Sequence, residues 1–473
     1  MTKRVLIIGN GMASTRVAAE IAKKKPDSSI VILGEEPHHA YDRTMLTEVL
    51  SGEVSEDQID LAEPPRNTAV HKNVRALRID RARRIVQDSR GTEHPYDALV
   101  IATGGTPRIP AVPGLPDSPG DLPRGVCVFS TLDDCRRILG LLAPGARAVV
   151  LGGGLLGLEA ARALVARGAD VEVLHRDDVV MNRQLNRRAS DLLIDKLAAL
   201  GVTVRTRQSL RGVRTHDGAV RAVELDDGQS VTCDLLVLAC GFEANTQLAA
   251  QAGLRTAQGV VVDARMRTSD PAIHAVGDCA EHEGTVSGLV GEAWRQADTA
   301  AASIAGEPPA DPGQAPPTAT RLKTAGIALT VMGESSAADG PHVHEVEDRA
   351  ARSYRRIVLR NGRLVGALVL GGRQTDAAPF LEQFRSGAHL TRDTALRLLH
   401  LQDTPEQHSG EAAVCYCNNV PQRTILQAWA EGASTVAAIA RRTKATTGCG
   451  ICRTTIEALL HTAEAERHQS APA

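Results

Sequence analysis

Aromatic residues are scarce in this chain, where they make up 2% of 473 residues. Its cores must therefore be built mainly from aliphatic side chains, and few rings are available to stack on nucleic-acid bases. An excess of one charge is also lacking, because 54 Lys and Arg balance 56 Asp and Glu to leave a net charge of −2. Neither a nucleic-acid partner nor disorder is indicated by these totals.

Long hydrophobic runs are missing as well. No apolar stretch reaches the roughly 18 residues that a membrane span needs. The first residues run straight into the apolar segment Val5–Ile8, which Gly9 ends, so it is too short for the apolar region of a signal peptide. We therefore expect a cytoplasmic protein with no membrane partner. A chain of this length is long enough for about three domains.

The chain holds nine cysteines. The cytosol keeps thiols reduced, so a disulfide framework is not expected. Five cysteines are scattered singly, and we interpret them as small buried hydrophobic residues: Cys127, Cys135, Cys233, Cys240 and Cys279. The other four lie close together near the C-terminus: Cys415, Cys417, Cys449 and Cys452.

A strand, a glycine-rich turn, a helix and a second strand follow one another twice, from Val5 and again from Ala148. The glycines permit a tight turn and a close approach to a pyrophosphate, whose negative charge the following helix N-terminus favours. The repeated pattern predicts two dinucleotide sites. The residues predicted to bind are Gly9, Gly11, Met12, Ala13 and Glu35 in the first copy, and Gly152, Gly154, Leu155 and Gly157 in the second.

Both copies depart from the ideal pattern. Ser14 takes the third glycine position of the first copy, which we expect to loosen the packing of helix on strand, whereas Glu35 is placed to bond a ribose hydroxyl. In the second copy His175 and Arg176 follow the strand where an acid is usual. Loss of the acid favours a 2′-phosphate, which Arg176 can pair with, and so favours NADPH. The alternative is that both residues are solvated surface side chains.

Two further segments extend the pattern: Tyr96–Gly104 ends in Ala-Thr-Gly, and Thr268–Asp278 ends in Gly-Asp. Together with the two glycine turns, and in the same order, they resemble the pyridine nucleotide-disulfide reductase superfamily. The resemblance implies FAD and NAD(P)H as cofactors. It implies that Asp278 binds the ribityl chain of FAD and that Glu159 lies near the nicotinamide carboxamide. The other residues that it implies at the FAD are Ala102, Thr103, Gly104 and Gly277.

The segment after the first acid, residues 39–47, contains no cysteine, and the second nucleotide unit contains no Cys-x-x-Cys. We therefore do not expect the dithiol chemistry of the disulfide reductases in this superfamily. The Ala-Tyr-Asp-Arg stretch resembles the superfamily's flavin-proximal motif, which implies that Arg43 approaches the FAD phosphates. An ordinary surface ion pair is the alternative for Arg43. Many relatives carry a lysine near the flavin where this chain has Glu48.

Three later segments narrow the resemblance: Gly284–Ala297, Arg321–Gly333 and Tyr354–Leu370. They are similar to the NAD(P)H-binding flavoprotein part of bacterial assimilatory nitrite and nitrate reductases, without the siroheme portion. The resemblance implies an electron-transfer subunit that takes electrons from NADH or NADPH. The partner it implies is a separate acceptor protein, the catalytic subunit of a nitrite or nitrate reductase.

The grouped cysteines form Cys415-x-Cys417 and, 31 residues later, Cys449-x-x-Cys452. Four thiolates suit a tetrahedral zinc or a [2Fe–2S] cluster. Between the pairs we expect one helix over 421–431 and a second one capped by Ser434. The arrangement resembles the bacterioferritin-associated-ferredoxin-like [2Fe–2S] domain. Zinc remains the structural alternative, but zinc cannot carry electrons away from a flavin.

These observations predict an α/β protein with two Rossmann-like domains, a small α+β domain and a small helical cluster domain. The predicted boundaries are 1–115 and 240–310 for FAD, 116–239 for NAD(P)H, 318–400 for the α+β domain, 411–463 for the cluster domain and 464–473 for a tail. The predicted enzyme is an NAD(P)H-dependent FAD oxidoreductase that needs no catalytic nucleophile. Two alternatives stay open: a subunit of an amino-acid or opine dehydrogenase complex, and a nucleotide-sensing flavoprotein with a zinc domain.

Overall fold

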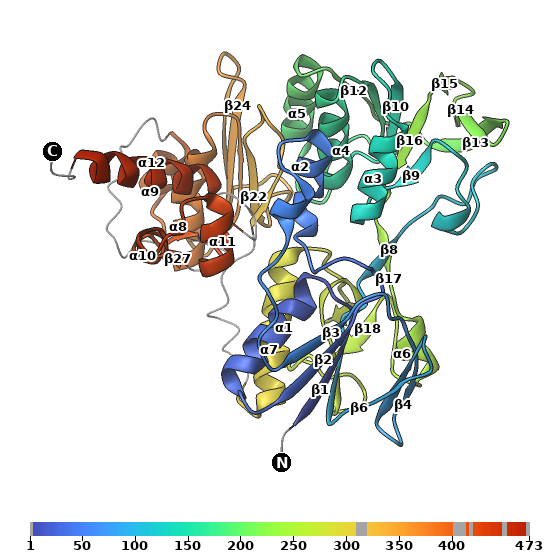
Figure 1. Ribbon diagram of the computed structural model, residues 1–473. Coiled ribbons are helices and arrows are strands. Elements are labelled where there is room, and N and C mark those ends of the chain that lie inside the picture. Colours follow the sequence, from blue (N-terminus) through green and yellow to red (C-terminus); the bar gives the residue numbers. More distant parts are fainter. Residues whose placement is uncertain (1–2, 309–318, 401–412, 416–419, 447–451, 470–473) are drawn as a thin grey trace. The chain divides into compact units, whose positions relative to one another are not determined.

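The computed structural model describes residues 3–308, 319–400, 413–415, 420–446 and 452–469 (Figure 1). They divide into two compact units. The first comprises Met1–Thr44, Glu56–Thr106 and Phe242–Ala315, and the second comprises Met45–Ser55, Pro107–Gly241 and Pro316–Ala473. Within the described ranges no helix combines the length and the apolar character that a membrane crossing requires.

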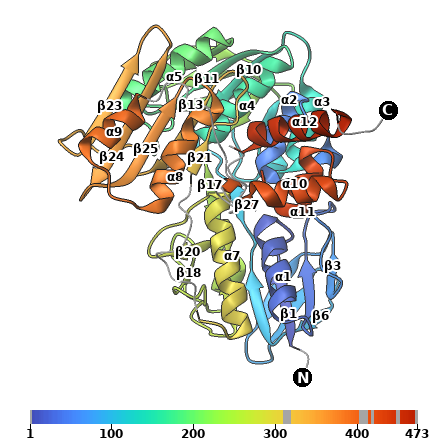
Figure 2. The same cartoon turned by 90° about the vertical axis from the view of Figure 1, so that its left-hand side faces the viewer.

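The first unit is built on a five-stranded parallel sheet in the order β19-β7-β1-β2-β3. Its central strand β1 (Arg4–Ile8) is an apolar run buried on both faces, as a parallel strand covered by helices requires. The helices α1 (Met12–Lys24) and α7 (Val290–Ala305) lie side by side in both views (Figure 2). The other strands are β2 (Ser29–Leu33), β3 (Thr68–His71), β7 (Ala98–Ile101) and β19 (Ile273–Ala275).

Smaller elements complete this unit. An antiparallel sheet joins β4 (Ala76–Asp80), β5 (Ile85–Asp88) and β6 (Glu93–Pro95). Two-stranded ladders pair β18 (Val260–Val262) with β20 (Ala280–His282) and β8 (Gly105–Pro107) with β17 (Phe242–Ala244). The short helices are η1 (Arg43–Met45), η2 (Glu56–Ile59), α6 (Gln247–Gln251) and η4 (Gly277–Cys279).

The second unit begins with another five-stranded parallel sheet, in the order β12-β11-β10-β16-β9. The two glycine turns therefore stand on equivalent parallel sheets, and the predicted α/β fold with two Rossmann-like units is confirmed. The strands are β9 (Val126–Val128), β10 (Arg147–Leu151), β11 (Asp170–Leu174), β12 (Val202–Arg205) and β16 (Leu235–Leu238). The helices are α2 (Leu46–Ser51), η3 (Pro119–Asp121), α3 (Leu132–Leu141), α4 (Leu155–Ala166) and α5 (Arg187–Ala199).

Two antiparallel sheets follow in the same unit. The first contains β13 (Leu210–His216), β14 (Ala219–Leu225) and β15 (Ser230–Thr232). The second has the order β21-β22-β25-β24-β23. Asn361 and Gly362, at φ 49° and 70°, form the tight turn between its two longest strands, as their sequence predicts. Its elements are β21 (Ala319–Arg321), β22 (Leu329–Gly333), β23 (Val343–Asp348), β24 (Ser353–Arg360), β25 (Arg363–Leu370), η6 (Gln374–Ala377), α8 (Ala378–Ser386) and α9 (Arg392–Leu399).

The C-terminal part has a hydrophobic core of its own. Thr435, not Ser434, caps its second helix, because the Thr435 hydroxyl accepts the N–H of Ala438 at 3.1 Å. The last helix runs to Gln469, past residue 464 where the sequence predicts the start of a tail. The elements are β26 (Ala413–Cys415), β27 (Val420–Pro421), α10 (Gln422–Ala430), α11 (Val436–Thr443) and α12 (Arg453–Gln469).

Candidate functional site

The first glycine turn lies between β1 and α1. Gly9 has φ +108°, and a Cβ there would lie 2.1 Å from the carbonyl oxygen of Ala102, so only glycine fits between these two strands. A Cβ at Gly11 would meet no heavy atom within 4 Å. The backbone beside Gly11 is therefore open to a close approach by a pyrophosphate, next to the N–H groups of Met12 and Ala13 in the first turn of α1.

Ser14 adds a hydrogen bond to this turn, which the sequence analysis does not predict. Its side chain is fully buried, and its hydroxyl accepts the N–H of Gly11 at 3.1 Å. The hydrogen bond satisfies one of the free donors at the start of α1. Serine thus replaces the close packing of a third glycine with a local hydrogen bond.

The Ala-Thr-Gly strand end is held by a residue that the sequence does not single out. The Thr103 hydroxyl donates to the backbone carbonyl of Asn245 at 3.0 Å, and the Asn245 amide donates to the backbone carbonyl of Thr103 at 2.8 Å. Gly104 follows with φ +67°, and a Cβ there would meet nothing within 4 Å. This reciprocal pair fixes the strand end while leaving an open surface beside Gly104.

Arg43 and Asp278 come together in the same unit, as their predicted roles at one cofactor require. Burial raises the pKa of Asp278 above its ordinary value, and the nearby Arg43 guanidinium opposes that rise. Arg43 also pairs with Glu36 and lies over the ring of Tyr41, 5.0 Å from its centroid. The Arg43 guanidinium suits a phosphate group, and the Asp278 carboxylate suits hydroxyl groups.

Glu35, the predicted ribose acid, is exposed. Its side chain is 70% exposed and 3.7 Å from Arg75. An exposed carboxylate after the second strand of a Rossmann unit is available to ribose hydroxyls. The N–H of Gly277 donates to the side-chain oxygen of Gln296 at 2.8 Å, and Gln296 is a buried residue of α7 that the sequence analysis missed.

The second glycine turn, between β10 and α4, is more tightly packed. A Cβ at Gly152 would lie 2.3 Å from the Ala239 carbonyl oxygen, and one at Gly157 would lie 1.9 Å from the Gly152 carbonyl oxygen. Gly154, the N-cap of α4, has open space around it, next to the first helical residue, Leu155. All three predicted glycines thus occupy positions that the backbone geometry reserves for glycine or leaves open to a ligand.

His175 faces inward, whereas Arg176 faces solvent. The His175 ring is buried, its Nδ1 accepts the N–H of Gly153 at 3.1 Å, and its Nε2 lies 3.1 Å from the Val179 carbonyl oxygen. The interpretation of His175 as a solvated surface residue is therefore wrong. Arg176 is 76% exposed and 3.6 Å from Asp177, in a position open to a nucleotide phosphate.

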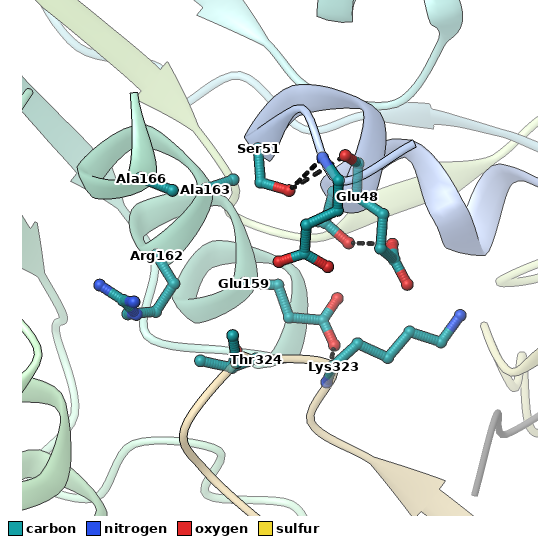
Figure 3. A pocket seen from close by; sticks show the side chains of 11 residues that line it. Glu48, Ser51, Glu159, Arg162, Ala163, Ala166, Lys323 and Thr324 are labelled. Carbon is teal, nitrogen blue, oxygen red and sulfur yellow. Dashed lines mark hydrogen bonds between the residues drawn. The ribbon is translucent and has the colours of Figure 1, made fainter. Parts of the chain in front are cut away.

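Glu159 lies in a pocket with Glu48 and Lys323 (Figure 3). It is 7% exposed, and its carboxylate accepts the backbone N–H of Lys323 at 2.6 Å. Burial raises the pKa of Glu159 to about 8, while the charge of Lys323 opposes this rise. Many relatives carry a lysine at the position of Glu48 on α2. In this chain the lysine beside the glutamate is Lys323.

The lone cysteines are poor nucleophiles. Burial raises the pKa of Cys127 to about 11 and that of Cys233 to about 12, and it raises the pKa of Cys279 as well. Cys240 is the more exposed one, and burial raises its pKa to about 11. These thiols stay protonated at neutral pH, which agrees with their interpretation as hydrophobic residues.

Two of the four grouped cysteines, Cys415 and Cys452, lie in the described residues. Both are buried in one small core, with Ile425, Ile439 and Ile456 around them. Cys417 and Cys449 lie outside the described residues. The strand β26 and the residue before α12 thus place the first and last cysteine of the motif in the same small core.

Two parallel-sheet units with open glycine turns and a cysteine-bearing helical domain define a flavin- and nicotinamide-dependent oxidoreductase. Residues 3–303 match the pyridine nucleotide-disulphide oxidoreductase family, and residues 413–462 match the BFD-like [2Fe-2S] binding domain. The chain belongs to this oxidoreductase family. Residues 318–382 match the rubredoxin NAD+ reductase C-terminal domain. The predicted cofactors FAD, NAD(P)H and a [2Fe–2S] cluster are confirmed by these matches.

Similar proteins agree with this assignment. The chain is 32% identical to a nitrite reductase [NAD(P)H] of Bacillus subtilis, over 97% of this chain and 57% of that relative. It is also 32% identical to the assimilatory nitrate reductase electron transfer subunit of the same species, over 97% and 59%. The chain therefore spans less than two thirds of these relatives. A covalent putidaredoxin reductase–putidaredoxin complex matches with a TM-score of 0.74 and 26% identity, over 81% of this chain and 93% of that one.

Proposed function

We propose that the chain transfers electrons from NAD(P)H through FAD to a [2Fe–2S] cluster and on to a separate acceptor protein. The acceptor we propose is the catalytic part of a nitrite or nitrate reductase, because the similar Bacillus subtilis proteins carry those names. We place the reaction in the cytoplasm, where NAD(P)H is regenerated and thiols stay reduced. Neither the amino-acid dehydrogenase alternative nor the zinc alternative is favoured by the relatives.

The observation that carries the proposal is the presence of two nucleotide folds and a cluster domain in one chain. FAD, when bound, supplies the chemistry that accepts a hydride and releases electrons singly. On the proposed assignment Gly11 and Arg43 hold the FAD phosphates and Asp278 holds its ribityl chain. Gly154 and Gly157 admit the nicotinamide nucleotide, and Arg176 contacts its adenosine end.

In the proposed electron-transfer route, electrons leave the chain through the cluster bound by the grouped cysteines. The first test therefore replaces a cysteine ligand. Serine is a harder and less acidic ligand than cysteine, so Cys415→Ser or Cys452→Ser should abolish the cluster. We expect these variants to lose the visible absorbance of the cluster and the delivery of electrons to a protein acceptor, by about 100-fold or more. Anaerobic bleaching of the flavin by NAD(P)H should continue.

The matched control is Cys127→Ser, which alters a buried cysteine of the NAD(P)H unit. This variant should keep its iron, its sulfide and its electron delivery. Iron analysis, visible spectra and turnover with the protein acceptor separate the outcomes. Full turnover in a Cys415→Ser protein that contains no iron refutes the cluster as the exit.

A further inference from the structure

One loop of the second unit contacts the glycine turn and also carries Arg176. It comprises residues 176–186, between β11 and α5, and we call it the nucleotide loop. The backbone N–H of Met181 donates to the carbonyl oxygen of Gly153, in the glycine turn, at 2.9 Å. Met181 is buried and has φ +49°, a left-handed conformation that residues other than glycine seldom adopt. The docked loop is therefore strained, and other contacts must hold it in place.

The position of Arg176 depends on this loop. The side-chain amide of Asn182 donates to the Asp177 carboxylate at 2.8 Å, and the Arg176 guanidinium lies 3.6 Å from the same carboxylate. The backbone N–H of Val180 donates to the hydroxyl of Ser190, on α5, at 3.0 Å. The start of the loop is thus tied to its middle, and its middle is tied to the following helix.

The end of the loop is held by the five-stranded antiparallel sheet, which lies in the same compact unit. Asn186 is the N-cap of α5, and its side-chain oxygen accepts the N–H of Ala189 at 3.1 Å. The amide group of Asn186 donates to the hydroxyl of Tyr354, on β24, at 2.8 Å. The hydroxyl of Ser335, just after β22, donates to the Gln184 carbonyl oxygen at 2.8 Å. Two hydrogen bonds therefore join the loop to residues 168 and 151 positions away.

The hydroxyl of Tyr354 has one possible arrangement in this network. Its O–H donates to the Glu345 carboxylate, on β23, at 2.6 Å, so its oxygen is left to accept the Asn186 amide. Burial raises the pKa of Tyr354 to about 12, and the hydrogen bond to Glu345 raises this pKa as well. The phenol therefore stays protonated at neutral pH, and the connection between the sheet and the loop persists.

A buried charge fixes Glu345 in turn. The Arg356 side chain is fully buried, and its guanidinium donates to Glu345 at 2.8 Å and to Asp339 at 2.7 Å. Glu345 also pairs with Arg188 of α5. A buried guanidinium needs such partners, and removing one of them is costly. The ion pairs thus hold Glu345 in place, and Glu345 holds the hydroxyl of Tyr354.

We propose that Tyr354 and Asn186 are positioning residues for the nicotinamide nucleotide, through which the antiparallel sheet holds the nucleotide loop on the glycine turn. This inference rests on the proposed function, in which Arg176 contacts the adenosine end of the nucleotide. When the hydrogen bond between the two residues is lost, a smaller fraction of the molecules has the loop docked. The apparent dissociation constant of the nucleotide then rises by the inverse of that fraction.

The first experiment uses the full-length protein with its cofactors and NADPH. Tyr354→Phe removes the hydroxyl and keeps the ring in the sheet. Anaerobic stopped flow should show that half-maximal flavin bleaching needs about tenfold more NADPH, the size expected for one lost hydrogen bond. The limiting rate at saturating NADPH should not change, because the loop serves binding alone. An unchanged half-saturating concentration, or a loss confined to the limiting rate, overturns the inference.

Asn186→Ser tests the same hydrogen bond from the side of the loop. Serine still caps the Ala189 N–H, but its shorter side chain does not reach Tyr354. We expect the same loss of NADPH affinity as in Tyr354→Phe, and no further loss in the double variant, because both changes break one interaction. Losses that multiply in the double variant contradict the inference. Asn186→Ser also decides the question if Tyr354→Phe does not fold.

Hydrogen exchange observes the loop without turnover. In the nucleotide-free protein, the amides of the nucleotide loop should exchange about tenfold faster in Tyr354→Phe than in wild type, because the loop undocks more often. Equal exchange in the two proteins overturns the inference. A wild-type flavin that NADPH does not bleach would instead contradict the proposed function, and the exchange rates would still show whether the sheet holds the loop.

Thr391→Ala is the matched control, because Thr391 caps α9, which packs against β23 and β24, by accepting the Thr394 N–H at 3.2 Å. Loss of this cap should lower the urea midpoint of unfolding, as Tyr354→Phe does. The NADPH concentration for half-maximal bleaching should stay at the wild-type value. An equal loss of NADPH affinity in Thr391→Ala would show a general effect of stability and would overturn the inference.

Discussion

The two glycine turns of this chain use the same motif with different packing. In the second unit, which we propose binds NAD(P)H, Gly157 lies so close to the turn that a Cβ would be 1.9 Å from the Gly152 carbonyl oxygen. In the first unit, which we propose binds FAD, the equivalent Ser14 has its side chain fully buried and bonded to Gly11. The first turn has room for a side chain, and the Ser14 side chain caps the helix there. The second turn has no room for a side chain at Gly157. A missing third glycine is therefore not a weaker version of the motif.

The ends of the second strands differ in the same way. Glu35 is exposed after β2, while His175 after β11 turns inward and accepts the Gly153 N–H. Leu33 and Leu174 end the two strands in equivalent register, so His175 takes the place of Gly34 and Arg176 takes the place of Glu35. His175 supports the glycine turn through its hydrogen bond, and the exposed Arg176 stands at the position of the usual acid.

The largest effect is expected at the third glycine of the NAD(P)H unit. Gly157→Ala places a Cβ against backbone that cannot move without shifting the turn, so we expect a loss of about 3 kcal/mol in stability and at least 100-fold in NAD(P)H affinity. Urea unfolding and nucleotide titration measure both. Gly140→Ala is the control, because Gly140 lies in α3 with nothing within 4 Å of its Cβ position. It should be neutral or stabilising by up to about 1 kcal/mol.

The next prediction concerns the inward histidine. His175→Leu leaves the buried Gly153 N–H without an acceptor, which should cost about 2 kcal/mol in the free energy of unfolding. His175→Asn is the matched variant, because its side-chain oxygen can take the place of Nδ1. Chemical denaturation of both proteins provides the comparison. Equal stability of the Leu and Asn variants would show that the hydrogen bond to Gly153 does not support the turn.

The strand, glycine turn and helix that begin each unit could be predicted from the sequence, because they are local features. The apolar run from Val5 to Ile8 and the Asn361-Gly362 turn are confirmed by β1 and by the hairpin of β24 and β25. The orientation of His175 and the arrival of Lys323 at Glu159 were not predictable. The orientation of His175 depends on its tertiary contact with Gly153. The contact between Lys323 and Glu159 joins residues that are 164 positions apart in the sequence.

A smaller effect is expected at Arg176. The side chain is 76% exposed, so a pairing with a 2′-phosphate is partly screened by water. Arg176→Ala should weaken NADPH relative to NADH by about 1–2 kcal/mol, which is about five- to thirty-fold in relative affinity. Titration of the nucleotide-free protein with each cofactor measures this ratio. Equal losses for NADH and NADPH contradict the hypothesis that Arg176 recognises the phosphate.

The smallest effect, at Ser14, separates the two explanations of the first turn most clearly. Completing the motif with Ser14→Gly should stabilise the turn if close packing is what the third position provides. If Ser14 acts as a cap, Ser14→Ala should lose about 0.5 kcal/mol of stability and Ser14→Gly about 0.5 kcal/mol more, since glycine also weakens the helix. Urea denaturation and FAD retention during dilution measure these losses.

The neighbouring Thr15→Ala is the control, because the Thr15 hydroxyl donates to the Gly11 carbonyl oxygen at 2.9 Å and caps no N–H group. A hydroxyl that bonds back to a carbonyl inside a helix adds little stability, so this change should be close to neutral. The order of stability should then be wild type and Thr15→Ala, followed by Ser14→Ala and last by Ser14→Gly. A Ser14→Gly protein that binds FAD as firmly as wild type and unfolds at higher urea would restore the close-packing explanation, and both units would then obey one rule.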